Sequence, residues 1–472
     1  MKAKGLNLNH LLFFLIAATA IRLYYISFGF LSSPEFLFFD EAQYWTWSKN
    51  LDLGYYSKPP MIGWLIAAFT SVCGDSIFCI KLPSPILHFF TALVVYLIGR
   101  DLYDKQTGIW ASLIYITLPG TSLSSSFIST DSLLMFFWAL GLYFFIRAVK
   151  SKDILDWILV GVFCGLGLMS KYTISIFAIA ALAFIILNSK NIYILKSIGI
   201  WVGALIAFII FLPNLAWNFS NDFISFSHTG ENVFSGGFSL YPMKMLEFIG
   251  AQFFVFSPIL FPALFVCAYK MIKKGEDKNS IDFYFTFVLL DIAILVSLIS
   301  GAQAHWGAPA YIAGSVLIAN FLKNRLGLIK LTLVLHIIIA AIFYNLHLIP
   351  LEKDPFARVK MWNIAALKAN SIAQDFPGAV FLSDERKMVA SLQYHLDNGR
   401  EAVKWNADRI PHDYYDMTTD MNNYQGRNFI LVTRSPSISH IAEYFKDSRE
   451  IFQVDTTRKT FSIYHLKNFR GY

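Results

Sequence analysis

Long apolar runs separated by short polar segments dominate the first 350 residues of the chain. A helix of roughly 20 apolar residues crosses about 30 Å of hydrocarbon, and these runs predict about eleven transmembrane helices. The predicted spans are residues 8–28, 80–99, 108–124, 132–149, 154–170, 172–188, 196–216, 247–269, 283–300, 308–322 and 327–348. Residues 1–349 are therefore predicted to form an all-α, multi-pass membrane domain, with an uncleaved first span.

The pattern changes after about residue 350, where no long apolar run remains. Short apolar or alternating segments at 379–382, 428–433 and 461–466 are typical of strands, and amphipathic stretches at 385–396 and 440–445 are typical of helices. Residues 350–472 are therefore predicted to form a small α/β domain. With an odd number of spans before it, this domain is expected on the extracytoplasmic side.

The first predicted outer loop, residues 29–79, is unusually polar for its position between apolar segments. Lys58 precedes two prolines, and a residue before proline is pushed out of the helical region. Pro59 suits the start of a helix, so Met61–Phe69 is predicted to be a short interfacial helix. Lys58 would then lie at its positive N-terminal end, a natural phosphate site. The alternative is a lysine that extends to a lipid headgroup.

Composition supports a membrane protein, because 56% of the residues are hydrophobic and only 15% are charged, whereas soluble domains carry about 25% charged residues. The formal net charge of +7 does not indicate nucleic acid, since the basic residues form no patch interleaved with aromatic residues. Of the basic residues before residue 350, most fall in the N-terminal tail and alternate short loops, where the positive-inside rule places the cytoplasm. The outer loops hold only Lys49, Lys58, Lys81, Lys171 and Lys244. The N-terminus is therefore predicted to be cytoplasmic.

Two adjacent carboxylates in the first outer loop, Asp40 and Glu41, are the strongest candidates for catalysis. A carboxylate at membrane depth costs about 2.5–3.5 kcal/mol, so it usually has a partner or a function. One of the two can act as a base or orient a nucleophile. The alternative is a helix-capping pair that binds Lys58 or Lys49.

Other polar residues lie at predicted outer helix boundaries. Asp131 follows Ser129 and Thr130 and precedes an apolar run, which is also what a helix N-cap looks like. Lys171 follows the predicted span 154–170. His305 precedes another span, and a lone histidine there is more often a hydrogen-bonded interface residue than a ligand.

Several common sites are not indicated. His228 and Glu231 lie in the outer segment 218–240, for which a solvated loop is the simplest interpretation. No zinc motif and no glycine-rich nucleotide loop is present, so an activated donor must come from the membrane.

Cys73 and Cys79 could form a disulfide if their loop is extracytoplasmic, but two buried thiols are favoured.

The order of these motifs resembles that in the membrane glycosyltransferases of the GT-C fold. The resemblance covers residues 8 to about 320, and it is carried by Asp40-Glu41, Tyr55 to Pro60, Thr130 to Leu134 and Ser170-Lys171. It is nearest to the bacterial transferases that modify lipid A or lipopolysaccharide core, the aminoarabinose and galacturonosyl transferases. Protein O-mannosyltransferases are more distant relatives.

The resemblance implies a polyprenyl-phosphate sugar as donor and a lipid or glycan acceptor on the periplasmic face of the inner membrane. It implies that Asp40 is the catalytic base. Ligands of the donor phosphate would be Lys58, Tyr55, Lys171, His305 and Tyr311. Asp131 would bind a lysine or a divalent metal cation.

Two departures from the family pattern concern the phosphate clamp and the metal. The aminoarabinose transferases have an arginine three residues after the aspartate, where this chain has Gln43. They also have an acidic residue before the lysine, where this chain has Ser57.

The function expected from the resemblance is inverting, single-displacement transfer of a sugar to a lipid A-type acceptor. Lys58 and Lys171 would stabilise the charge on the departing phosphate. A protein or extracellular polysaccharide acceptor is an alternative. A flippase or transporter is less favoured, because transporters hold ionisable groups near the midplane and often show inverted repeats.

Overall fold

The computed structural model describes residues 6–234, 239–276, 280–396, 400–456 and 458–472. By packing, these residues divide into two compact units. Unit 1 comprises residues 1–24, 58–62 and 81–344, and unit 2 comprises residues 25–57, 63–80 and 345–472. The first outer loop, which the sequence analysis assigned to the membrane domain, is thus grouped mostly with the C-terminal segment in unit 2.

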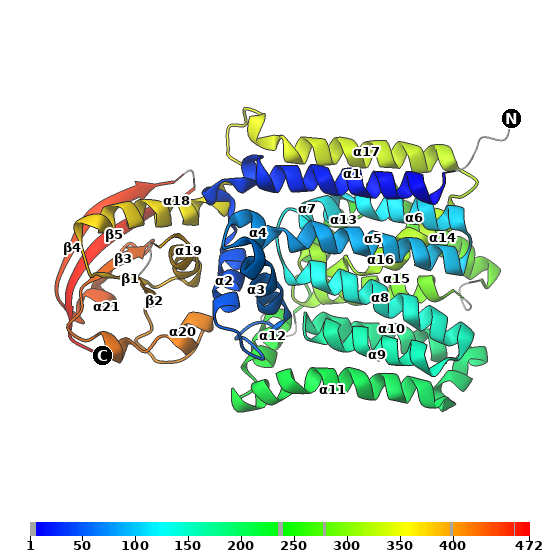
Figure 1. The fold of residues 1–472 in the computed structure, drawn as a ribbon, viewed down its shortest axis with the longest axis horizontal. Helices are drawn as coiled ribbons and strands as arrows, with labels where there is room; N and C mark the ends of the chain where they lie inside the picture. Colours follow the sequence, from blue (N-terminus) through cyan, green and yellow to red (C-terminus); the bar gives the residue numbers. More distant parts are fainter. Residues whose placement is uncertain (1–5, 235–238, 277–279, 397–399, 457) are drawn as a thin grey trace. The chain divides into compact units, whose positions relative to one another are not determined.

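Unit 1 is a helical bundle, whose helices run side by side in Figure 1. Its helices are α1 (Leu8–Ser27, whose last residues belong to unit 2), α5 (Pro83–Leu102), α6 (Lys105–Thr117), α7 (Pro119–Ser124), α8 (Thr130–Ser151), α9 (Ile154–Leu168), α10 (Ser175–Ile186), α11 (Ile198–Ser220), α12 (Ile224–Phe234), α13 (Pro242–Val255), α14 (Leu260–Lys274), α15 (Ile281–Ile299), α16 (Ala310–Phe321) and α17 (Leu326–Tyr344). Neighbours in this bundle include α5 with α6 and α8, α9 with α8 and α11, and α15 with α10 and α16.

Six helical segments of the described chain are long and apolar enough to cross a membrane. They are Leu8–Ser27, Ile77–Leu102, Thr130–Ser151, Ile198–Ser220, Ile281–Ile299 and Leu326–Tyr344. The number of about eleven spans is therefore not confirmed, although the helical class is. Several of the other predicted spans are shorter apolar helices, such as α9 and α16.

The span predicted at 247–269 is not one straight helix. The chain forms two helices there, α13 and α14, which meet at an angle of 104°. Pro258 lies in the break, where it lacks the N–H that a continuous helix needs and restricts the residue before it. The segment 218–240, interpreted as a solvated loop, contains helix α12; its residues 235–238 lie outside the described part of the chain.

Close packing of α9 on α11 fixes the helix that leads to Lys171. A Cβ atom added at Gly161 would lie 2.3 Å from the carbonyl oxygen of Gly203, so only glycine permits the two backbones to approach this closely. After α9 ends, the carbonyl of Met169 accepts a hydrogen bond from the N–H of Met61 at 3.0 Å. The segment that carries Lys58 is therefore tied to the residues just before Lys171.

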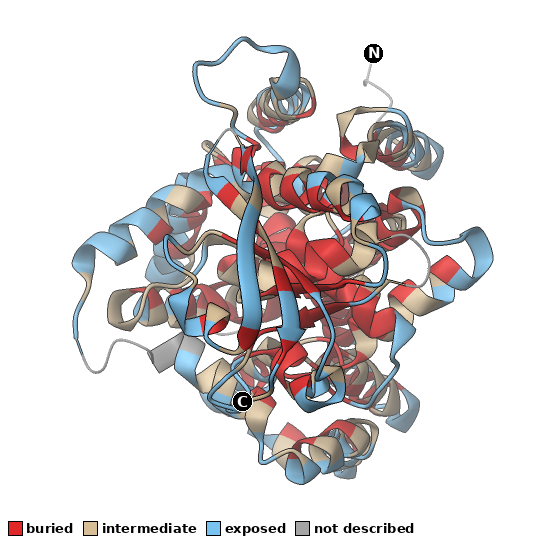
Figure 2. Ribbon diagram, turned by 90° about the vertical axis from the view of Figure 1, so that its left-hand side faces the viewer, coloured by how far each residue is buried: buried red, intermediate tan, exposed pale blue. Residues whose placement is uncertain are grey.

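Unit 2 is built on a mixed five-stranded sheet with the order β2-β1-β3-β5-β4. Its strands are β1 (Val380–Ser383), β2 (Ala402–Lys404), β3 (Phe429–Thr433), β4 (Phe445–Asp455) and β5 (Thr460–Phe469). Strand β1 pairs in parallel with β2 and β3, and β5 pairs antiparallel with β3 and β4. The predicted strands at 379–382, 428–433 and 461–466 correspond to β1, β3 and β5. Edge strand β4 is largely exposed (Figure 2).

The helices of unit 2 are α2 (Phe39–Lys49), α3 (Met61–Cys73, which begins in unit 1), α4 (Ile77–Lys81), α18 (Ala357–Ile372), α19 (Arg386–His395), α20 (Tyr414–Thr418) and α21 (Ser439–Ala442). Helix α19 confirms the amphipathic stretch predicted at 385–396, and α3 confirms the short helix predicted from Met61. Helix α19 packs against both the sheet and α2. The C-terminal sheet and the first outer loop therefore share one core.

Cys73 and Cys79 form a disulfide between the ends of α3 and α4. The sequence favoured two buried thiols here, and that interpretation is wrong. The spacing of six residues lets the chain turn between two short helices, which brings the two Cα atoms to 6.0 Å, within the range that a disulfide spans.

Candidate functional site

Asp131 is the centre of a polar cluster in unit 1. It lies in the first turn of α8, whose N-cap is Ser129, because the Ser129 hydroxyl accepts a hydrogen bond from the Asp131 N–H. The carboxylate of Asp131 is therefore not needed as the cap. Its Oδ1 atom lies 2.6 Å from Nζ of Lys171, and its Oδ2 atom lies 3.7 Å from Nε2 of His305. Three residues that the sequence analysis selected separately are thus brought together.

The ion pair between Asp131 and Lys171 is shielded from water, since these side chains are only 20% and 13% exposed. A charge-assisted hydrogen bond of this length is strong, and removing one partner would leave an uncompensated charge. Lys171 lies between α9 and the short 3₁₀ helix Tyr172–Ile174. The cluster is therefore held by the ends of several packed helices.

Lys58 contributes its charge to this cluster. Burial lowers the pKa of the His305 imidazole, and the charges of Lys171 and Lys58 lower it further, while the Asp131 carboxylate opposes them. The net direction is downward, which favours the neutral imidazole. Lys58 and Lys171 then supply two positive charges, and Asp131 supplies one negative charge. The cluster thus contains two cations, and cations suit an anionic group.

Tyr311 lies next to the segment that carries His305, and its hydroxyl forms a buried hydrogen bond. Its hydroxyl donates to Oε1 of Gln252 at 2.7 Å, and the ring stacks on Phe256 at 4.2 Å. The Gln252 amide in turn donates to the carbonyl of Ala304 at 3.1 Å. In this arrangement Tyr311 holds the backbone beside His305. Its predicted contact with a donor phosphate stays a prediction.

In unit 2, Asp40 and Glu41 have different environments although they are adjacent. Glu41 is buried, and its Oε2 accepts a hydrogen bond from the N–H of Phe38 at 2.9 Å, which caps the N-terminus of α2. Asp40 is 37% exposed, and its Oδ1 lies 3.0 Å from Nη1 of Arg386. Of the two carboxylates, Asp40 is therefore the more accessible to a substrate.

Arg386, the first residue of α19, was missed by the sequence analysis. The same Nη1 group donates to Oε1 of Gln43, one helical turn from Asp40. Burial disfavours the charged guanidinium, but the Asp40 carboxylate more than offsets this, and the pKa of Arg386 is raised. A cation therefore does occupy the neighbourhood of position 43, although it comes from the C-terminal segment. The only sequence signal for Arg386 was the group of charged residues at the start of the stretch 385–396.

Tyr55 is buried in the same unit, where it packs against residues of its own loop. Its ring stacks on Trp47 at 4.4 Å, and its Oη lies 3.0 Å from the carbonyl oxygen of Trp47 and 3.1 Å from that of Asn50. Burial raises the pKa of its hydroxyl. The role of Tyr55 as a ligand of a donor phosphate stays a prediction.

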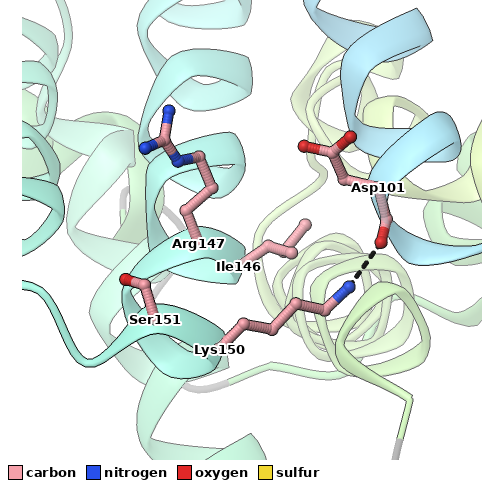
Figure 3. Close-up of a pocket in the computed structure, with 5 residues that line it drawn as sticks. All are labelled: Asp101, Ile146, Arg147, Lys150 and Ser151. Carbon is pink, nitrogen blue, oxygen red and sulfur yellow. Dashed lines mark hydrogen bonds between the residues drawn. The ribbon is translucent and has the colours of Figure 1, made fainter.

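A depression in unit 1 lies at the C-terminal ends of α5 and α8 (Figure 3). It is lined by Asp101, Ile146, Arg147, Lys150 and Ser151. Its two cations are already engaged: Lys150 donates to the Asp101 carbonyl, and Arg147 lies 3.1 Å from Asp156. At 1.5 Å per residue, the length of α8 separates Lys150 from Asp131 by about 28 Å. This depression is not part of the Asp131 cluster.

Comparisons with known proteins support the resemblance. Residues 57–217 match the family described as dolichyl-phosphate-mannose-protein mannosyltransferase, a range that includes Lys58, Asp131 and Lys171. Over 396 residues the chain is 33% identical to the lipid A galacturonosyltransferase RgtD of Rhizobium johnstonii, covering 80% of this chain and 82% of that protein.

Less similar proteins also match the chain. The chain is 24% identical over 297 residues to undecaprenyl phosphate-alpha-4-amino-4-deoxy-L-arabinose arabinosyl transferase 1 of Pseudomonas fluorescens, covering 60% of this chain and 52% of that protein. The crystal structure of ArnT from Cupriavidus metallidurans bound to undecaprenyl phosphate superposes with a TM-score of 0.71 at 10% identity, covering 97% and 98% of the two chains. This likeness confirms the predicted fold.

Proposed function

Because the chain belongs to the GT-C membrane glycosyltransferases, the family of the lipid A galacturonosyltransferase of Rhizobium johnstonii, we propose that it transfers a sugar from a polyprenyl phosphate to lipid A. The observation that carries this proposal is the similarity to that relative, which extends over 80% of the chain. The donor class is supported by the likeness to ArnT, which was crystallised with undecaprenyl phosphate. The sugar we expect is a hexuronic acid, as in the name of that relative.

The Asp131 cluster is assigned to the donor phosphate. Lys58 and Lys171 supply positive charge, and the His305 imidazole can donate a hydrogen bond. Fixed charges that are aimed at a group whose negative charge grows during reaction usually make the largest contribution to catalysis. Asp131 keeps Lys171 in place through the 2.6 Å ion pair.

Asp40 is assigned to the acceptor. In the proposed step an acceptor oxygen attacks the anomeric carbon from the side opposite the phosphate. The new C–O bond forms as the bond to the phosphate oxygen breaks, and the polyprenyl phosphate leaves with that electron pair. If the acceptor is a hydroxyl, its proton passes to Asp40. If the acceptor is an ionised phosphate, no proton moves, and Asp40 positions the acceptor by accepting a hydrogen bond from one of its hydroxyl groups.

The residues around Asp131 do not fit a metal site. Metal sites built wholly from protein ligands need several carboxylate, imidazole or thiolate groups, and within the described ranges no three His, Cys, Asp or Glu residues gather in this way. One oxygen of Asp131 is already bound by the Lys171 ammonium group. Of the two alternatives for Asp131, the lysine partner is therefore adopted, and no step is assigned to a metal.

Mass spectrometry of lipid A and core oligosaccharide tests the proposed function. Cells that carry the wild-type protein are expected to show a mass increment of one hexuronic acid on lipid A, which cells without the protein lack. An increment of a different sugar on lipid A would correct the donor sugar alone. An unchanged lipid A profile would contradict the acceptor assignment and direct the search to glycoproteins and exopolysaccharide.

We further propose that the chain lies in the inner membrane with a cytoplasmic N-terminus and a periplasmic C-terminal domain. The distribution of Lys and Arg among the loops supports this orientation. The disulfide in the first outer loop also supports it, because such bonds persist in the periplasm and are rare in the cytosol.

Maleimide labelling of the denatured protein tests this orientation. The sequence has four cysteines, of which Cys164 and Cys267 are free and Cys73 and Cys79 are bonded. We expect two adducts without reduction and four after reduction. The matched control is the Cys73→Ser/Cys79→Ser variant, which should give two adducts in both conditions. Four adducts on the unreduced wild-type protein would contradict a periplasmic first loop.

A further inference from the structure

The guanidinium of Arg386 holds two side chains of α2 at once. It lies 3.0 Å from Oδ1 of Asp40 and donates from the same nitrogen to Oε1 of Gln43. Asp40 and Gln43 are three residues apart on one helix and therefore share a face. Helix α19 packs against α2, so its first residue arrives at this face.

Arg386 is itself held in place. Its guanidinium lies over the ring of Phe39 at 5.7 Å, and its neighbour Glu385 is bound by Arg434 through two hydrogen bonds. The side chain of Arg386 is 31% exposed, so water screens the contact with Asp40 only partly. These contacts reduce the number of conformations open to the guanidinium, which makes it a fixed reference for the Asp40 carboxylate.

The contact leaves the Asp40 carboxylate with one oxygen engaged and one available. Oδ1 is bound by Arg386, whereas Oδ2 has no hydrogen bond or ion pair with another residue in the described part of the chain. A carboxylate on an exposed first turn would otherwise rotate freely about its last torsion. Fixing one oxygen defines the direction in which the other can accept a proton or contact an acceptor.

We propose that Arg386 is a positioning residue, which orients Asp40 through Oδ1 so that Oδ2 is presented to the acceptor. This inference rests on the role that the proposed function gives to Asp40. It assigns to the C-terminal segment a direct part in the reaction, because the orienting cation comes from α19. If the contact only held α19 against α2, substitution of Arg386 would affect kcat and stability differently.

The test compares Arg386→Gln, Arg386→Lys and the double variant Arg386→Gln/Gln43→Arg in purified full-length protein, with donor and lipid A supplied. Hydrogen bonds to charged groups contribute about 1.5–3 kcal/mol, so Arg386→Gln should lower kcat about 10- to 100-fold. The KM for the donor should stay unchanged, because the proposed function assigns the donor phosphate to other residues. The kcat of Arg386→Lys should lie between those of the wild-type protein and Arg386→Gln, since lysine keeps the charge but lacks the planar guanidinium group.

The double variant separates positioning from structure. Position 43 contacts the same guanidinium, so an arginine there can supply a cation to Asp40 from within α2. We expect it to regain at least about one third of the kcat that Arg386→Gln loses. The matched control is Lys467→Gln, which removes a cation from an exposed pair with Asp447 and should leave kcat and the melting temperature unchanged.

Three results would overturn the inference. The first is full kcat in Arg386→Gln. The second is a loss that follows a lower melting temperature and is not restored by Gln43→Arg. The third is a rise in donor KM with unchanged kcat. Failure of the proposed function looks different: the wild-type protein would transfer no sugar to lipid A, and the same variants would then be scored on the acceptor that the wild-type protein does use.

Discussion

Replacing Lys171 with methionine is expected to lower the rate of sugar transfer about 100- to 1000-fold, the effect of removing one group that stabilises charge in a transition state. The same change should lower the free energy of unfolding by about 3–5 kcal/mol. Both effects follow from the 2.6 Å contact between Lys171 and Asp131 and from its shielding, at 13% and 20% exposure. Transfer is measured by mass spectrometry of lipid A, and stability by thermal unfolding in detergent.

The double variant Asp131→Asn/Lys171→Met distinguishes a phosphate ligand from a partner of Asp131. Removing both charges should restore most of the lost stability, because no uncompensated charge remains. It should not restore transfer, because the positive charge for the phosphate is still absent. If the double variant regains transfer together with stability, Lys171 serves only to neutralise Asp131.

A matched control is available in the exposed pair Lys49 and Asp75. Their charged atoms lie 2.5 Å apart, but the side chains are 42% and 47% exposed. Exposed pairs contribute about 0–1 kcal/mol, so Lys49→Met should change stability little and transfer not at all. An equal loss in Lys49→Met would show that the assay responds to any missing lysine.

The Asp131 cluster could be predicted in part because each of its members interrupts an apolar pattern. A charged residue at the end of a membrane helix is costly and therefore stands out against its neighbours. Asp131, Lys171 and His305 were each identified in this way. Their mutual contacts were not, because local periodicity carries no information about which helix ends meet. The sequence also left open whether Asp131 caps its helix, and only the hydrogen bond from its N–H to Ser129 decides that.

The contact between Arg386 and Asp40 could not be predicted from the sequence pattern. It is separated from Asp40 by 346 positions in the chain, and nothing in the amphipathic stretch at 385–396 indicates a partner in the first outer loop. The substitution of Gln43 for the arginine of related transferases suggested a missing cation. The fold shows instead that another segment supplies it.

Strands β1, β3 and β5 were predicted from their apolar or alternating patterns, whereas the three-residue strand β2 and the edge strand β4 were missed. Strands β1 and β3 are buried throughout and were recognised from their apolar runs. Strand β4 was missed because it forms an edge and most of its residues are exposed, so it has no hydrophobic pattern to detect. The break at Pro258 was overlooked although proline is its physical cause, because the apolar run continues across it.

Asp40→Asn is expected to lower transfer about 100- to 10,000-fold if the acceptor is a hydroxyl, because general base catalysis contributes that much. The substitution keeps the size of the side chain but removes its charge and its ability to take a proton. If the acceptor is an already ionised phosphate, the loss should be about tenfold or less, because no proton transfer is lost and only a hydrogen bond from a hydroxyl of the acceptor to Asp40 weakens. The size of the effect on kcat therefore reports which acceptor group reacts.

Glu41→Gln is the matched control for this prediction, because the two carboxylates are adjacent but differently used. Glutamine can keep the hydrogen bond that Glu41 accepts from the Phe38 N–H, so α2 should stay capped and the loss of transfer should be smaller than in Asp40→Asn. A large loss in Glu41→Gln with a normal rate in Asp40→Asn would reverse the assignment and make Glu41 the catalytic carboxylate. That outcome would also require α2 to open, because Glu41 is only 1% exposed. The burial of Glu41 and the partial exposure of Asp40 are thus the physical reason to assign the acceptor to Asp40.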